Sequence, residues 1–99
     1  MSRDFDEKRD FIRMLLDVPL HCKDPGTGET LTGQAHDLSS KGVAFVLDRA
    51  YEPGKRLEVR IRPEKSVVPP LHARVEVVRV EPDVSGRSFR IGARILEYL

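Results

Sequence analysis

The chain has 99 residues, one cysteine and no tryptophan, and its formal net charge is +1 although 33% of its residues are charged. This length fits a single domain with one modest core. A lone cysteine excludes an internal disulfide framework and favours the reducing cytoplasm. The near-neutral net charge argues against a general DNA or RNA binder. Because the start of the chain is charged and no long apolar run follows, we expect neither a secretory signal nor membrane insertion.

The first segment, residues 1–16, is rich in charge and lacks the period-two alternation of a strand. We expect it to form an arm outside the folded body, either flexible or partly helical. The arm carries Arg9 and Arg13, which would share one face of a helix because they are four residues apart. Their planar guanidinium groups match phosphate oxygens and the O6/N7 edge of guanine. The alternative is that both are surface arginines paired with acidic neighbours such as Asp10.

The remainder, residues 17–99, consists of short apolar runs separated by clusters of Gly, Pro, Asp and Ser. This pattern predicts six strands. They are centred on residues 18–23, 30–37, 42–48, 56–62, 71–80 and 88–96. Short connections favour antiparallel pairing, and this many short strands must close to bury one core. We therefore predict an all-β domain, a six-stranded antiparallel β-barrel.

The alternation also predicts which side chains face the core. It is clearest in residues 56–62, where Leu57, Val59 and Ile61 share one face. We also expect Phe45 and Phe89 in the core. In residues 71–80 the alternation slips near Val77 and Val78, which indicates a bulge. Residues 54–74 contain six basic and two acidic side chains, a surplus of four positive charges, which we interpret as a solvated strand face.

A second motif, Asp37-Leu-Ser39-Ser-Lys-Gly42, falls between two of the predicted strands. Its Asp and Ser offer acceptors for the N1 and N2 protons of guanine, and Gly42 allows the backbone to approach a neighbour closely. A simple Asx or Ser turn, with Gly42 at positive φ, explains the same residues without a ligand. The joint occurrence of both motifs with the Gly-containing strand at residues 91–95 points instead to a site for guanine and phosphate.

In this order and at this spacing, the motifs resemble those of the PilZ domain family of cyclic di-GMP receptors, over roughly residues 7–96. The resemblance implies that Arg9 and Arg13 bind phosphate and the Hoogsteen edge of guanine. It also implies that Asp37, Ser39 and Gly42 receive the other side of the base. A domain of this kind would be a cytoplasmic bacterial second-messenger receptor that takes cyclic di-GMP as ligand, needs no cofactor or metal, and signals through an effector protein still to be identified.

Further candidate contacts surround these two motifs. Many family members have arginine at the position of Lys8, and that position is associated with binding an intercalated pair of ligands. Lysine supplies charge but not the planar guanidinium group of arginine, so the domain could bind one ligand molecule or an intercalated pair. The other candidates are Asp10, Lys41, Arg79 and Gly92; a solvated turn lysine and a packing glycine are the ordinary alternatives for Lys41 and Gly92.

Two other classes of function were weighed against a nucleotide receptor. The first is a β-barrel that serves only as a protein-interaction module, with its arginines in surface ion pairs and no nucleotide bound. The second is RNA binding by a basic face, which would need exposed aromatic side chains, and these are scarce in the chain. No nucleophile, metal cluster or paired carboxylate site emerges, so we predict no catalytic residue and no enzymatic activity.

Overall fold

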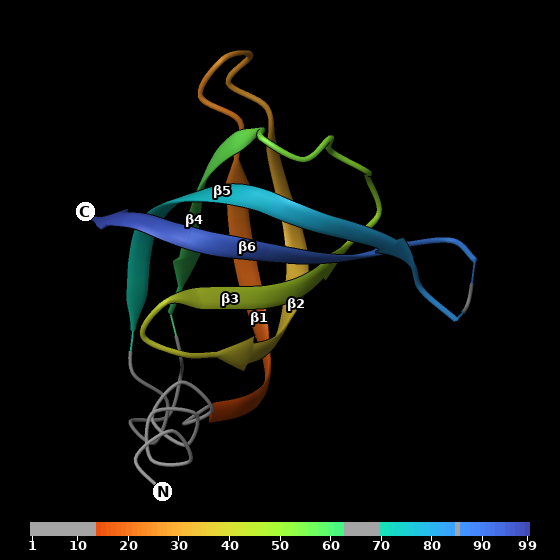
Figure 1. Cartoon of the computed structure of the whole chain (residues 1–99), viewed down its shortest axis with the longest axis horizontal. Coiled ribbons are helices and arrows are strands. Elements are labelled where there is room, and N and C mark those ends of the chain that lie inside the picture. The colour runs from red at the N-terminus through yellow and green to blue at the C-terminus, as the bar shows by residue number, and fades with distance from the viewer. Residues whose placement is uncertain (1–13, 63–69, 85) are drawn as a thin grey trace, which may run out of the picture.

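The computed structural model describes residues 14–62, 70–84 and 86–99. Within these ranges the chain forms six β-strands and no helix, so no helix there could cross a membrane. The strands are β1 (Met14–Lys23), β2 (Thr30–Leu38), β3 (Gly42–Leu47), β4 (Arg56–Ile61), β5 (Leu71–Pro82) and β6 (Phe89–Tyr98) (Figure 1). All six predicted strands are therefore confirmed. β1 begins earlier than residue 17, where the sequence placed the start of the barrel.

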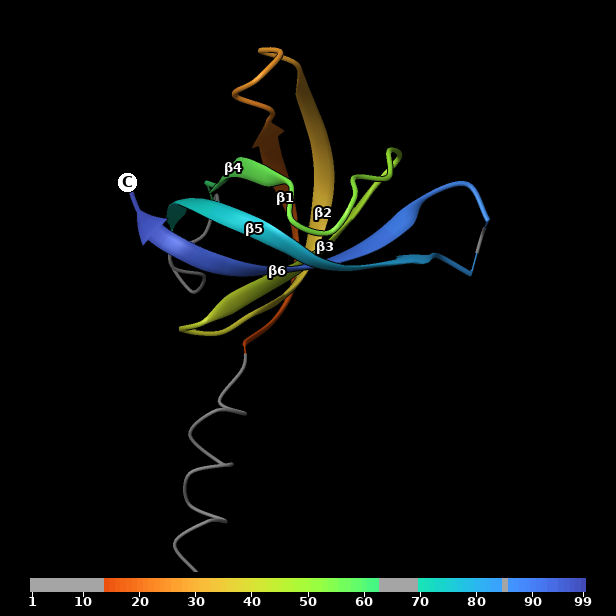
Figure 2. The same cartoon turned by 45° about the horizontal axis from the view of Figure 1, so that its top comes forward.

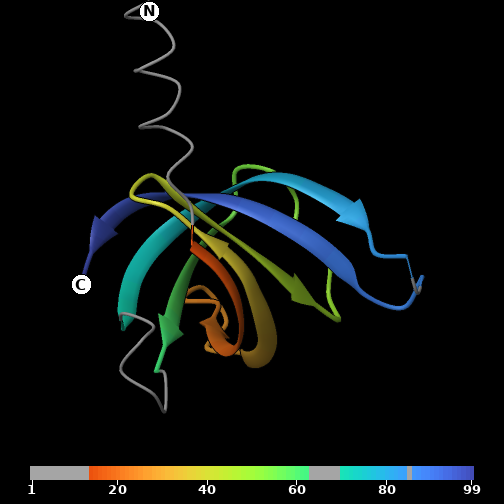
Figure 3. The same cartoon turned by 90° about the horizontal axis from the view of Figure 1, so that it is seen from below.

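The strands close into a barrel in the order β1-β2-β3-β6-β5-β4, and every neighbouring pair is antiparallel. The predicted all-β antiparallel barrel is thus confirmed. Closure depends on a short pairing between β1 and β4, in which residues 21–23 face residues 58–60. The β5–β6 hairpin is long and projects beyond the other strands (Figure 2). Seen from below, β1 and β2 lie on one side of the barrel and β5 and β6 on the other (Figure 3).

The core is filled by apolar side chains from all six strands. Leu57, Val59 and Ile61 are completely buried, as the alternation in β4 predicts, and Phe45 is also buried. The expectation for Phe89 is wrong, because its side chain is only half-buried and stays outside the core cluster. Phe89 is the first residue of β6 and pairs with Pro82, the last residue of β5, so it lies at the end of the β5–β6 hairpin and away from the centre of the core.

Among the register shifts between neighbouring strands, one in β5 and one in β2 adjoin the β3–β6 pair. In β5, Val77 pairs with Ala93 and Arg79 with Gly92, so Val78 has no opposite residue. This is the bulge predicted from the sequence. In β2, residues 35 and 37 pair with neighbouring residues of β3, which leaves His36 as the extra residue. Bulges bend a strand and re-aim its side chains, and here they lie on both sides of the β3–β6 pair.

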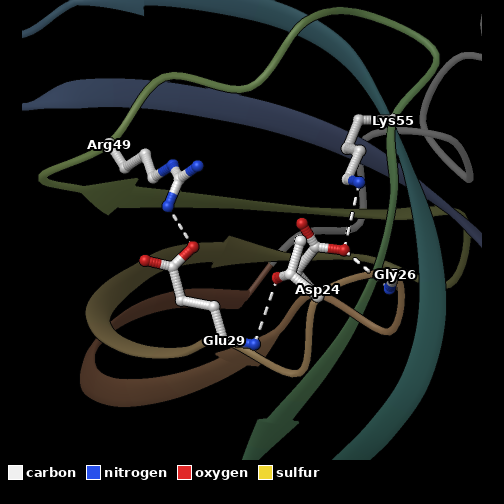
Figure 4. A network of polar contacts seen from close by, with 6 residues as sticks. Asp24, Gly26, Glu29, Arg49 and Lys55 are labelled. Carbon is white, nitrogen blue, oxygen red and sulfur yellow. Dashed lines mark hydrogen bonds and ion pairs between the residues drawn. The ribbon is translucent and has the colours of Figure 1, made fainter.

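The turn between β1 and β2 is tied to the loop before β4 by two ion pairs (Figure 4). The buried carboxylate of Asp24 lies 3.0 Å from the ammonium of Lys55 and accepts the N–H of Gly26 at 2.9 Å. The hydrogen bond from Lys55 is the main cause that lowers the pKa of Asp24, and burial opposes it. Arg49 pairs with Glu29 on the same side. These contacts connect the top of the hairpin to the rest of the barrel.

Candidate functional site

The predicted Asp37–Gly42 motif forms the connection from β2 to β3. The hydroxyl oxygen of Ser39 accepts the N–H of Gly42 at 3.2 Å and the N–H of Lys41 at 3.3 Å. The backbone N–H of Ser39 donates to the carbonyl oxygen of Gly42 at 2.9 Å. The Ser turn that was weighed as the ligand-free explanation is therefore present. It also fixes the shape of this corner of the barrel before any ligand arrives.

Gly42 is needed for a close approach and not for an unusual backbone angle. A Cβ atom at position 42 would lie 2.7 Å from the carbonyl oxygen of Ala93 in β6, a distance that real Cβ contacts do not show. The close backbone approach at Gly42 is thus made to the neighbouring strand β6. The positive φ considered for Gly42 is wrong, because the glycines with positive φ are Gly28, Gly54 and Gly86. Gly42 is the first residue of β3 and has the extended conformation of a strand.

A depression of about 220 Å³ on the outer face of the barrel brings five of the predicted site residues together. They are Asp37, Ser39, Gly42, Arg79 and Gly92. The first three come from the β2–β3 corner, and the last two come from β5 and β6. The side chain of Arg79 lies over Gly92, where an added Cβ would stand 3.5 Å from Nη2 of the guanidinium. The bulge at Val78 immediately precedes Arg79.

A second depression, of about 420 Å³, continues from the first toward the β5–β6 hairpin. The two share Asp37, Ala44, Arg79 and Gly92, so they form one continuous groove. Sequence reasoning did not nominate Ala44, which contributes a small side chain to both depressions. Its position between the buried residues Val43 and Phe45 was the available signal, because alternation turns it outward.

Four of the predicted residues, Lys8, Arg9, Asp10 and Arg13, lie outside the described residues. The point where their segment joins the barrel is nevertheless defined. Met14, the first residue of β1, pairs with Leu38, and Leu15 pairs with Asp37. The first residues of β1, which directly follow Arg13 in the sequence, therefore lie beside the Asp37–Gly42 turn.

The cationic side chains near the groove have different surroundings. Arg79 and Arg90 line the groove, and within the described ranges neither forms an ion pair with a carboxylate. Arg94, opposite Gly42, instead binds Glu76 through Nε at 3.0 Å and Nη2 at 2.6 Å. Lys41 is exposed in the turn, has a polar interaction of its own and does not line either depression.

The groove combines the guanidinium groups of Arg79 and Arg90 with a floor of small residues, which lets a planar group approach the backbone. Its carboxylates are those of Asp37, Glu81 and Asp83, so it offers both donors and acceptors of hydrogen bonds. Across the described part of the chain, no three His, Cys, Asp or Glu side chains come close enough to hold a metal ion.

Comparison with solved structures shows the same fold in ten chains, and three of them are described here. The inhibitor of motility MotI/DgrA of Bacillus subtilis has a TM-score of 0.71 at 19% identity, covering 88% of this chain and 42% of that one. YcgR of Escherichia coli in complex with c-di-GMP has a TM-score of 0.68 at 18% identity, covering 87% of this chain and 37% of that one. The PilZ domain of YcgR with c-di-GMP has a TM-score of 0.60 at 16% identity, covering 87% of this chain and 77% of that one. The chain thus spans less than half the length of MotI or YcgR.

The sequence comparisons address the family directly. No curated protein matches the sequence. The family model of the PilZ domain matches residues 7–98, which is nearly the whole chain and includes all six strands. The chain belongs to the PilZ domain family.

Proposed function

We propose that this domain is a receptor for cyclic di-GMP, which binds between the arm that carries Arg9 and Arg13 and the turn at residues 37–42. The observation that carries the proposal is the pairing of Met14 with Leu38, since Met14 directly follows Arg13 in the sequence and Leu38 directly precedes Ser39. Family membership supports the same ligand, since two of the similar structures are described with c-di-GMP.

The proposed roles follow from the chemistry of the ligand, which carries two phosphates and two guanines. Arg9 and Arg13 clamp phosphate and the Hoogsteen edge of one guanine, because a guanidinium fork matches both. Asp37 accepts hydrogen bonds from the N1–H and N2–H groups of guanine. Gly42 gives the base access to the backbone, and Arg79 is suited to neutralise a phosphate above Gly92.

Lys8, next to the arginine motif, is the candidate that bears on how many ligands bind. Asp10 within that motif and Lys41 in the β2–β3 turn provide secondary contacts. A single molecule would fill the depression at the β2–β3 corner. An intercalated pair would extend along the continuous groove toward the β5–β6 hairpin, whose depression measures about 420 Å³.

We further propose that the domain acts by binding and not by turnover, in the cytoplasm, and that it signals through an effector protein. In this mechanism the ligand orders residues 1–13 against the barrel and so creates a new surface for the effector. Hydrogen exchange of the arm with and without ligand tests this step. Unchanged exchange rates in a saturated sample would reject it.

Calorimetric titration with cyclic di-GMP tests the receptor function itself. Arg9→Ala and Arg13→Ala should each weaken binding by about tenfold or more, because a charge-assisted hydrogen bond contributes about 1.5 to 3 kcal/mol. Arg3→Ala is the matched control, since Arg3 lies in the same arm outside the motif. The fitted stoichiometry distinguishes one ligand from two.

The competing ligands decide between this proposal and its rivals. GMP, cyclic di-AMP and single-stranded RNA should bind much more weakly than cyclic di-GMP. Equal binding by all of them would indicate a nonspecific basic face. Absence of cyclic di-GMP binding in a folded sample would favour the barrel that acts only as a protein-interaction module.

A further inference from the structure

A second groove lies on the other side of the barrel, across the outer faces of β1, β2 and β4. Its volume is about 460 Å³, larger than either depression near the Asp37–Gly42 turn. In the closed strand order β1 and β4 lie opposite β3 and β6. The groove shares no lining residue with the proposed nucleotide site. Its outward side chains include His21, Lys23, Thr30, Thr32, Arg60 and Arg62.

The charges in this groove are mostly positive. Lys23 lies opposite Glu58 in the β1–β4 pair, and the charges of Lys23 and Arg60 both act on that carboxylate. Within the described residues, Lys23 and Arg62 form no side-chain ion pair or hydrogen bond. Arg60 contacts the imidazole of His72 at 3.3 Å and no carboxylate. Glu58 is the one acidic residue among the described lining residues, and His72 already binds its carboxylate. This hydrogen bond is the main cause that lowers the pKa of Glu58.

The spacing of the basic side chains follows the geometry of the sheet. Arg60 lies on β4 and Arg62 directly follows Ile61, the last residue of that strand; both line the groove, and two residues of extended chain separate them by about 6.8 Å. His21 and Lys23 have the same relationship on β1, and His21 lies directly opposite Arg60. The two rows are therefore about 4.8 Å apart. An extended peptide with acidic residues at every second position has the same repeat as each row.

We propose that this groove binds an extended acidic segment of a partner protein, whose alternate carboxylates meet Arg60, Arg62 and Lys23. The hydroxyl groups of Thr30 and Thr32 on β2 supply hydrogen bonds along the same groove. The charge pattern selects a peptide over a nucleic acid for two reasons. The described lining residues include no Phe or Tyr on which bases would stack. The net charge of +1 is also too low for general attraction to polyphosphates.

A titration followed by amide chemical shifts tests this inference on the full chain, whose mass of 11.2 kDa suits the method. The probe is a short peptide in which glutamate and threonine alternate, and glutamine replaces glutamate in the control peptide. We expect saturable shifts confined to residues 21–23, 30–32 and 58–62, with a Kd below ~1 mM. The double variant Arg60→Gln and Arg62→Gln should weaken binding by about tenfold or more.

Arg56→Gln is the matched control, because Arg56 is exposed on the same face of β4 and does not line the groove. It should retain the affinity of the wild-type chain. The proposal is overturned if the acidic peptide causes no saturable shifts, or if the control variant loses as much affinity as the double variant. Equal binding of single-stranded RNA of the same charge would also overturn it. Cyclic di-GMP binding by the double variant should stay unchanged. A failure of the peptide-binding proposal can therefore be told apart from a failure of the receptor function.

Discussion

Gly42 lies so close to Ala93 that a Cβ atom at position 42 would stand 2.7 Å from the carbonyl oxygen of Ala93. Gly42→Ala must therefore push β3 away from β6, and we expect it to lower the free energy of unfolding by about 1 to 3 kcal/mol. Gly92→Ala is the matched control on the partner strand, since its Cβ would meet Arg79 at an ordinary 3.5 Å. Urea unfolding measures the free energy of unfolding of both variants. An equal decrease in Gly42→Ala and Gly92→Ala would contradict the prediction.

Arg79 should matter for ligand binding and not for stability. It lines both depressions of the groove and, within the described ranges, forms no ion pair that its removal would break. We expect Arg79→Ala to weaken cyclic di-GMP binding by about tenfold while its unfolding midpoint stays at the wild-type value. Calorimetry and urea unfolding are the two measurements, and Arg56→Ala, outside the groove, is the control. A normal affinity in Arg79→Ala would remove this residue from the site.

The ion pair between Asp24 and Lys55 should make stability depend on acid pH. The pKa of Asp24 is lowered in the folded state, so the unfolded chain binds more protons and stability rises with pH. The contribution is complete above the ordinary value of 3.8 and is lost as pH falls below it, through the lowered pKa of the folded state.

Asp24→Asn removes this titration, so the difference in Tm between wild type and variant should shrink as the pH falls from neutral to below about 3. Lys55→Met should act in the same direction, because it deletes the hydrogen-bond donor. Arg56→Met serves as control, since Arg56 is exposed on β4 and forms no ion pair with the described residues. A Tm difference between wild type and Asp24→Asn that stays constant with pH would show that this carboxylate does not stabilise the fold through its charge.

The single cysteine should be unreactive in the native protein. Burial is the main cause that raises the pKa of the Cys22 thiol to about 12, with smaller contributions from Asp24 and Glu29. Because the thiolate is the reactive form, we expect labelling by an aromatic disulfide reagent at pH 8 to be at least ~100-fold slower in buffer than in urea. Rapid labelling of the folded chain would mean that the β1 end of the barrel opens readily.

The fold could be predicted wherever alternating apolar residues show which side chains of a strand face the core. In β4 the alternation of Leu57, Val59 and Ile61 identifies the buried face, and in β5 the slip near Val78 identifies the bulge. The sequence of β2 is too polar to show which residues face the core, so the bulge at His36 could not be predicted. Phe89 was misplaced because hydrophobicity alone does not tell whether a hairpin end is covered.

The candidate site could be predicted only in its local part. The motif at residues 37–42 is contiguous, and its turn chemistry is visible in the residue types. The contribution of Arg79 and Gly92 depends on the register between β5 and β6, which the bulge at Val78 sets. The second groove was invisible for the same reason. The surplus of positive charge in residues 54–74 was evident, but only the pairing of β1 with β4 brings Lys23 and His21 to Arg60.

The inner face of β3 packs in the core, and its outer face lines the groove. Val43 and Phe45 point into the core, whereas Ala44 points into the groove and Gly42 forms its edge. A larger or more polar residue at position 44 would reshape the floor of the groove without entering the interior. Single substitutions on the outward face of β3 can therefore change which ligand the groove prefers while the packing of the core stays the same.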